Sequence, residues 1–112
     1  MANFTLAVTD VVNETPSLPN VIISEVSPWS SSNSPYGADW FEVTNTGSST
    51  VDITGWRIDD DSNNFANSVA LNGVTSIAPG QSIIFIEGDA TTTNAFKTAW
   101  FGSNVPSGFT IG

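Results

Sequence analysis

The apolar residues of this chain fall into short runs, and each run is bounded by Gly, Pro, Asn, Asp or Ser. The run over 4–11 alternates large apolar residues with small or polar ones, and the run over 82–87 is nearly continuous in apolar residues. Successive side chains of a β-strand point to opposite faces, so both patterns are typical of strands that cover a core. The chain is therefore predicted to form short strands joined by many turns.

The types of residue in these runs favour the same fold class. Val, Ile and Thr number 32 together, whereas Leu, Met, Lys, Arg, Gln and Glu number only 11. β-branched side chains suit pleated strands, and the strongest helix formers other than Ala are scarce. We therefore expect an all-β domain in which about seven or more short strands form a two-sheet sandwich.

The expected elements can be placed along the chain. Strands are expected over 4–11, 21–26, 40–44, 51–53, 56–58 and 82–87, with weaker candidates over 65–71 and 109–111. The run over 21–26 is apolar on both faces at its start, which favours an inner position in a sheet. One short helix is expected over 93–101, near the C-terminus, with Thr93 or Asn94 as its cap and Gly102 after its end.

The charged and metal-binding residues exclude several classes of function. The chain has 2 Lys or Arg against 11 Asp or Glu, a formal net charge of −9, and neither Cys nor His. Without Cys and His it has no disulfide, no expected zinc site, and no Ser-His-Asp or Cys-His catalytic group. With two cations it is expected to bind neither nucleic acid nor an anionic membrane, and no run is long enough for membrane insertion.

The same composition bears on where the protein works. Acidity, very few Lys, no Cys and abundant Ser, Thr and Asn favour an extracellular or cell-surface location, although an acidic cytosolic domain is the alternative. The first residues contain no basic region followed by a long apolar run, so no Sec signal peptide is seen.

Aromatic residues in the loop over 27–38 form the first candidate site. Trp29 and Tyr36 lie there among Ser, Pro and Gly. They could form a lid over one end of the sandwich, or a contact surface for a protein or a polysaccharide, because rigid amphipathic aromatics serve both purposes. Trp56, at the start of a strand, is expected to pack in the core.

Acidic residues provide two further candidates. Asp59, Asp60 and Asp61 form the densest oxygen cluster, which suits either calcium or a solvated loop with local turns. Glu25 and Glu42 lie on neighbouring predicted strands, where a carboxylate pair could in principle hydrolyse a glycoside. So small a sandwich leaves little room for a cleft, so we expect these carboxylates to accept hydrogen bonds from loop backbone or Arg57, and we expect no enzymatic activity.

The order of motifs resembles the lamin tail domain family in its bacterial form. The most specific parts are the Gly55-Trp56 pair before one strand and the Pro79-Gly80-Gln81 turn before the next. The matching segments, in order, are 23–26, a Trp-containing loop, 39–47, 51–60 and 77–83. The resemblance covers 21–112, with the strand and the Pro-containing linker over 1–20 before it.

The resemblance implies an immunoglobulin-like β-sandwich without a catalytic centre, which serves for binding or attachment in a bacterial secreted or surface protein. It also implies one or two more strands after residue 112, so either the sequence is a fragment or a strand comes from elsewhere. The apolar side chains Phe4, Leu6 and Val8 could complete their own sandwich or pair with a neighbouring copy, giving oligomers or filaments by exchange of residues 4–12. Besides the attachment module and the strand-exchanging subunit, a further alternative is an accessory domain of a secreted hydrolase. Calcium is the one cofactor that the sequence suggests.

Overall fold

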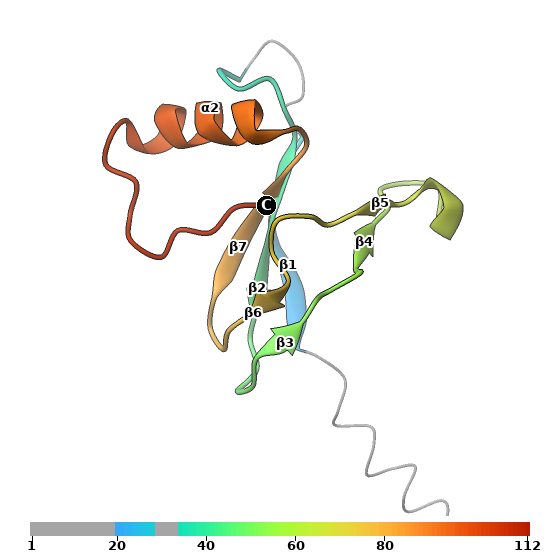
Figure 1. Ribbon diagram of the computed structural model, residues 1–112. Coiled ribbons are helices and arrows are strands. Elements are labelled where there is room, and N and C mark those ends of the chain that lie inside the picture. Colours follow the sequence, from blue (N-terminus) through green and yellow to red (C-terminus); the bar gives the residue numbers. More distant parts are fainter. Residues whose placement is uncertain (1–19, 29–33) are drawn as a thin grey trace, which may run out of the picture.

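A central antiparallel sheet with the strand order β1–β2–β7 organises the molecule (Figure 1). The computed structural model describes residues 20–28 and 34–112. The strands are β1 (Val21–Ser27), β2 (Trp40–Asn45) and β7 (Ser82–Ile86). All three contain the apolar runs that predicted them, and both strand pairs are antiparallel.

Two small two-stranded sheets follow β2 in the chain. β3 (Val51–Asp52) pairs with β6 (Ser76–Ile77), and β4 (Arg57–Ile58) pairs with β5 (Val69–Ala70). The weak strand expected over 65–71 is confirmed only in its second half, where β5 lies, because the 3-10 helix η2 (Phe65–Asn67) occupies its first half. Since β6 has only two residues, no alternation marked it in the sequence.

The helix α2 (Ala90–Phe101) begins three residues earlier than the sequence predicted. Its cap is Asp89, whose carboxylate accepts hydrogen bonds from the N–H groups of Thr91 and Thr92. Gly88, just before this cap, has a φ of 145°, and a Cβ there would collide with the side chain of Thr92. The end of the helix at Gly102 agrees with the prediction.

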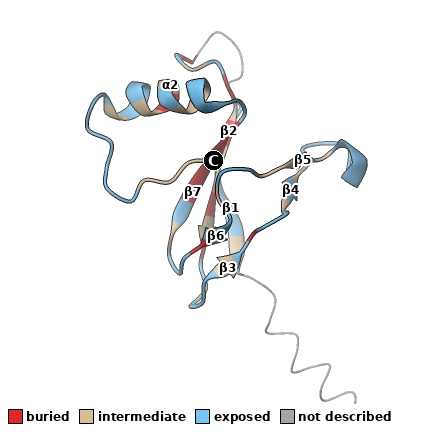
Figure 2. Ribbon diagram, viewed as in Figure 1, coloured by how far each residue is buried: buried red, intermediate tan, exposed pale blue. Residues whose placement is uncertain are grey.

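Apolar side chains pack on both faces of the central sheet. Figure 2 shows that buried residues are concentrated along β2 and β7. On one face the buried core residues are Val43, Ile53, Ile77, Ile83 and Phe85, which join the sheet to β3 and β6. On the other face the buried residues are Ala38, Trp40, Ile84, Ile86 and Phe96, under α2. Trp56 is partly buried against the first cluster, which confirms its predicted packing role.

The C-terminal residues lie along β7 in the parallel direction. Ile111 bridges Ile84, and the N–H of Gly112 donates to the carbonyl of Ile84 at 2.8 Å. The expected all-β fold with one short helix near the C-terminus is confirmed. Within the described part of the chain, no helix is both long and apolar enough to cross a bilayer. The predicted strand over 4–11 lies outside the described residues.

Candidate interaction surface

β1 is an edge strand whose apolar side chains are largely exposed to solvent. The exposed fraction of its side chains is 50% for Ile22, 55% for Ile23 and 63% for Val26. β1 ends the strand order of its sheet, and no backbone hydrogen bond to its outer side is formed by residues 20–28 or 34–112. The expectation of an inner position for 21–26 is therefore wrong for this part of the chain, although the apolarity that prompted it is real.

The register with β2 determines which face each exposed side chain extends. Ile23 lies opposite Val43 and Val26 lies opposite Phe41, so both continue the face that carries the buried core. The register shifts between Ile23 and Glu25, which marks a β-bulge at Ser24. Ile23 and Val26 thus extend the core face without being covered by the described residues. We use the name β1 surface for these two side chains together with Ile22 and the unpaired backbone edge of β1.

The opposite face of the sheet carries a row of hydroxyl groups. The Ser24 hydroxyl lies 2.8 Å from Oε1 of Glu42 and 2.7 Å from Oγ1 of Thr44, which in turn lies 2.7 Å from Oγ of Ser82. Glu25 lies opposite Glu42 in the register, as expected for neighbouring strands. The carboxylate of Glu42 accepts from Ser24, and this network joins all three strands of the sheet.

Tyr36, one of the two loop aromatics singled out in the sequence, packs over the end of the sandwich. Its ring centroid lies 5.1 Å from that of Phe96, and its hydroxyl oxygen accepts a hydrogen bond from Nε1 of Trp40 at 3.1 Å. The side chain is half-buried, so it has a packing role. Binding through its exposed part stays a prediction, and Trp29 lies outside the described residues.

The acidic loop brings three carboxylates together. Oxygen atoms of Asp59, Asp60 and Asp61 lie within 4.8 Å of one another. A hydrogen bond from Ser62 lowers the pKa of Asp59, whereas the negative charge of Asp60 raises the pKa of Asp61. The folded state therefore binds the Asp61 proton more tightly than the unfolded state does, so this repulsion destabilises the fold progressively as the pH rises from the ordinary pKa of an aspartate through the raised pKa of Asp61. Calcium binding by this cluster stays a prediction.

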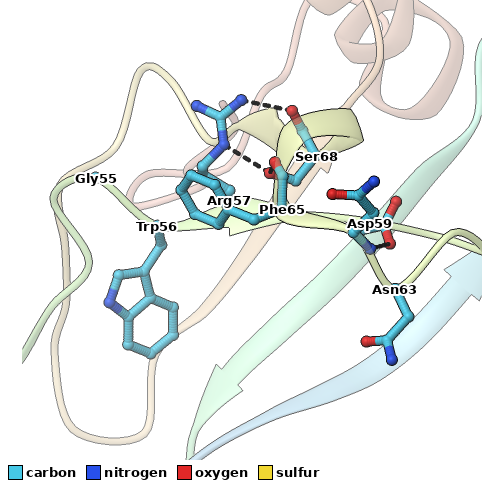
Figure 3. Close-up of a pocket in the computed structure, with 8 residues that line it drawn as sticks. Gly55, Trp56, Arg57, Asp59, Asn63, Phe65 and Ser68 are labelled. Atoms are coloured by element: carbon cyan, nitrogen blue, oxygen red, sulfur yellow. Dashed lines mark hydrogen bonds between the residues drawn. The ribbon is translucent and has the colours of Figure 1, made fainter.

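A pocket of about 600 Å³ lies on the β4–β5 hairpin (Figure 3). Arg57 donates from Nε to Oγ of Ser68 at 2.7 Å and from Nη2 to the Ser68 carbonyl, and its guanidinium carbon lies 5.2 Å from the ring centroid of Phe65. Pairing of Arg57 with a carboxylate, which the sequence suggested, is therefore wrong for the described residues. In Figure 3, Arg57 and Phe65 lie side by side while Trp56 points away from them.

The β1 surface and the Arg57 contacts were both missed from the sequence. The signal for the first was present, because Ile22 and Ile23 are consecutive and must lie on opposite faces of a strand. The signal for the second was absent, since Ser68 lies eleven residues after Arg57 and the two meet only through the β4–β5 pairing.

Comparison with known proteins bears on the family. Neither a curated protein nor a solved structure matches the chain. A sequence model of the lamin tail domain family matches residues 14–110, most of the chain, in agreement with the motifs and the antiparallel strands. This family consists of non-catalytic immunoglobulin-like domains that usually mediate protein interaction. The chain belongs to the lamin tail domain family.

Proposed function

We propose that this domain is a non-catalytic attachment module of a bacterial secreted or cell-surface protein, and that it binds a partner protein through the β1 surface. The observation that carries the proposal is a strand edge that none of the described residues pairs with, combined with Ile22, Ile23 and Val26, each at least half exposed. An extended peptide can pair with such an edge and cover its apolar side chains at the same time.

A protein partner is favoured over a polysaccharide by the chemistry of this surface. The edge offers backbone N–H and C=O groups at strand spacing, which a peptide strand matches in register and a saccharide does not. Covering a half-exposed Ile or Val contributes about 1 kcal/mol, and each new backbone hydrogen bond adds about 1 kcal/mol. The binding free energy at β1 is therefore the sum of several small apolar and hydrogen-bond contributions, and each of them requires that β1 be accessible to the partner.

The extracellular or cell-surface location in this proposal is supported by composition alone. Eleven acidic residues against two basic ones, with no Cys, give a chain that neither depends on a disulfide nor binds polyanions. The sequence contains neither a Cys nucleophile nor a His general base, and this composition favours attachment over catalytic turnover.

The proposal predicts where peptides selected for binding will attach. Peptides taken from a phage-displayed random library are expected to alternate in apolarity and to shift the backbone amide resonances of Val21–Ser27. The double variant Ile23→Lys/Val26→Lys is expected to weaken their binding about 100-fold, because two apolar contacts are lost and a charge is placed at each. Isothermal titration calorimetry gives the affinities, and the amide spectrum gives the location.

The matched control is Val105→Lys, which alters an exposed Val far from β1 in the chain. Both variants change solvent-exposed positions, so their melting temperatures should stay close to that of the parent protein. Unchanged affinity of the double variant, or peptides that shift only residues of the β4–β5 hairpin or α2, would contradict the proposal.

A further inference from the structure

We infer that the β1 surface accepts residues 4–11 of a second copy of this chain, which add to β1 as an antiparallel strand. The inference rests on the proposed function, since it names the partner that occupies the same surface. It assigns a role to the apolar segment that precedes the linker over 12–20.

The receiving strand has the sequence of a strand with two neighbours. Val21, Ile22 and Ile23 are consecutive apolar residues, so both faces of β1 are apolar at its start. Edge strands are normally protected by charges, Pro, a bulge or a short length. In the seven residues of β1 this protection is confined to the bulge at Ser24 and one charge, Glu25, so Ile22 and Ile23 before the bulge are left unprotected. The strand is therefore suited to a second neighbour on the side away from β2.

The donor segment matches this strand in pattern and length. Residues 4–11 alternate, with Phe4, Leu6 and Val8 on one face and Thr5, Ala7 and Thr9 on the other. A strand of eight residues is long enough to pair along the whole of β1. With the face of Leu6 turned toward the core, its apolar side chains would lie beside Ile23 and Val26.

The linker is long enough for the donor segment to reach another copy. The carbonyl of Asn20 accepts hydrogen bonds from N–H and Oγ1 of Thr46, so the chain enters β1 from a fixed point beside the end of β2. The linker contains Pro16 and Pro19, and proline favours extended backbone in itself and in the residue before it. A linker of this length can reach about 28 Å when it is extended, which is enough to bring residues 4–11 to the β1 of another copy.

Charge gives the exchange a characteristic dependence on salt. Each copy carries a formal net charge of −9, so two copies repel each other at low ionic strength. The contacts between the donor segment and β1 are mainly apolar and are not weakened by salt. Self-association is therefore expected to strengthen as sodium chloride is added, opposite to an interface held by ion pairs.

The first test measures the mass of the full chain in solution by size-exclusion chromatography with light scattering. Reciprocal exchange gives twice the chain mass of 11.8 kDa, and one-way exchange gives a series of multiples, so either result supports the inference. Leu6→Asp is expected to weaken self-association about 100-fold, because a charge replaces a buried apolar side chain. Thr5→Asp, on the other face of the same segment, is the matched control and should retain it.

The second test identifies the copy that receives the segment. Because the chain has no Cys of its own, only the introduced Cys residues can form a disulfide. Equal amounts of Val8→Cys and Ile23→Cys are mixed and oxidised, and a disulfide between the two chains is expected, with none when Val105→Cys replaces Ile23→Cys. In the double variant Val8→Cys/Ile23→Cys, exchange gives linked chains. A disulfide that closes within a single chain would overturn the inference.

The two proposals fail in different ways. A chain that stays monomeric at all salt concentrations, yet still binds selected peptides through β1, would overturn exchange and leave the attachment function standing. Peptide binding that does not depend on Ile23 and Val26 would overturn the attachment function itself. Self-association that survives both Leu6→Asp and Ile23→Lys would overturn exchange at this surface.

Discussion

Replacing Asn45 with Ala is expected to lower the free energy of unfolding by about 3 kcal/mol. The Asn45 side chain is fully buried and makes three hydrogen bonds to backbone groups. Nδ2 donates to the carbonyls of Ser49 and Ile77, at 2.8 Å and 2.9 Å, and Oδ1 accepts from the N–H of Gly47 at 2.9 Å. An Ala leaves these groups without a partner in a place that water does not readily reach.

Urea denaturation followed by circular dichroism measures this loss. Asn104→Ala, at an exposed position in the C-terminal loop, is the matched control and should change stability by less than about 0.5 kcal/mol. A loss below about 1 kcal/mol for Asn45→Ala would contradict the role of Asn45 as the residue that joins the turn after β2 to β6.

Phe96→Ala is expected to be the most destabilising substitution in α2, at about 4 kcal/mol. Phe96 is the buried residue of the helix, and its ring lies among four other aromatic rings. Centroid distances from Phe96 are 5.1 Å to Tyr36, 5.7 Å to Trp40, 6.0 Å to Trp100 and 6.1 Å to Phe109. Truncation removes apolar burial and leaves a cavity between α2 and the sheet.

Thermal and urea denaturation test this substitution, and the near-ultraviolet circular dichroism of the Trp residues should weaken as Trp40 loses its packing partner. Thr98→Ala, on the exposed side of the same helix, is the control and should be neutral or slightly stabilising, since Ala favours helix. Equal effects of Phe96→Ala and Thr98→Ala would show that α2 does not contribute to the core.

Local pattern predicted the strands that are buried on both faces and the helix end. β2 and β7 carry enough apolar residues to be recognised, and Gly102 has the positive φ, 61°, that ends α2. The start of α2 was predicted too late in the chain because its first turn contains Thr residues, which are weak helix formers. That turn is stabilised by the Asp89 carboxylate, which accepts hydrogen bonds from the N–H groups of Thr91 and Thr92.

The candidate surface was harder to predict, for a physical reason. Side-chain pattern reports that a strand is suited to burial, but it does not report what covers the strand, so β1 was expected inside a sheet. The partner of Arg57 depends on pairing between β4 and β5, which a linear pattern does not encode. The proximity of Asp59, Asp60 and Asp61 was predictable because they are consecutive in the chain.

Amide hydrogen exchange along β1 tests the central claim most directly, since the claim is that this edge is accessible to a partner strand. In the full chain, diluted until it is monomeric, the amides of Val21–Ser27 that point away from β2 are expected to exchange rapidly. With a selected peptide bound, the same amides should exchange at least about 10-fold more slowly. Slow exchange of every β1 amide in the free monomer, or no slowing on peptide binding, would contradict the account.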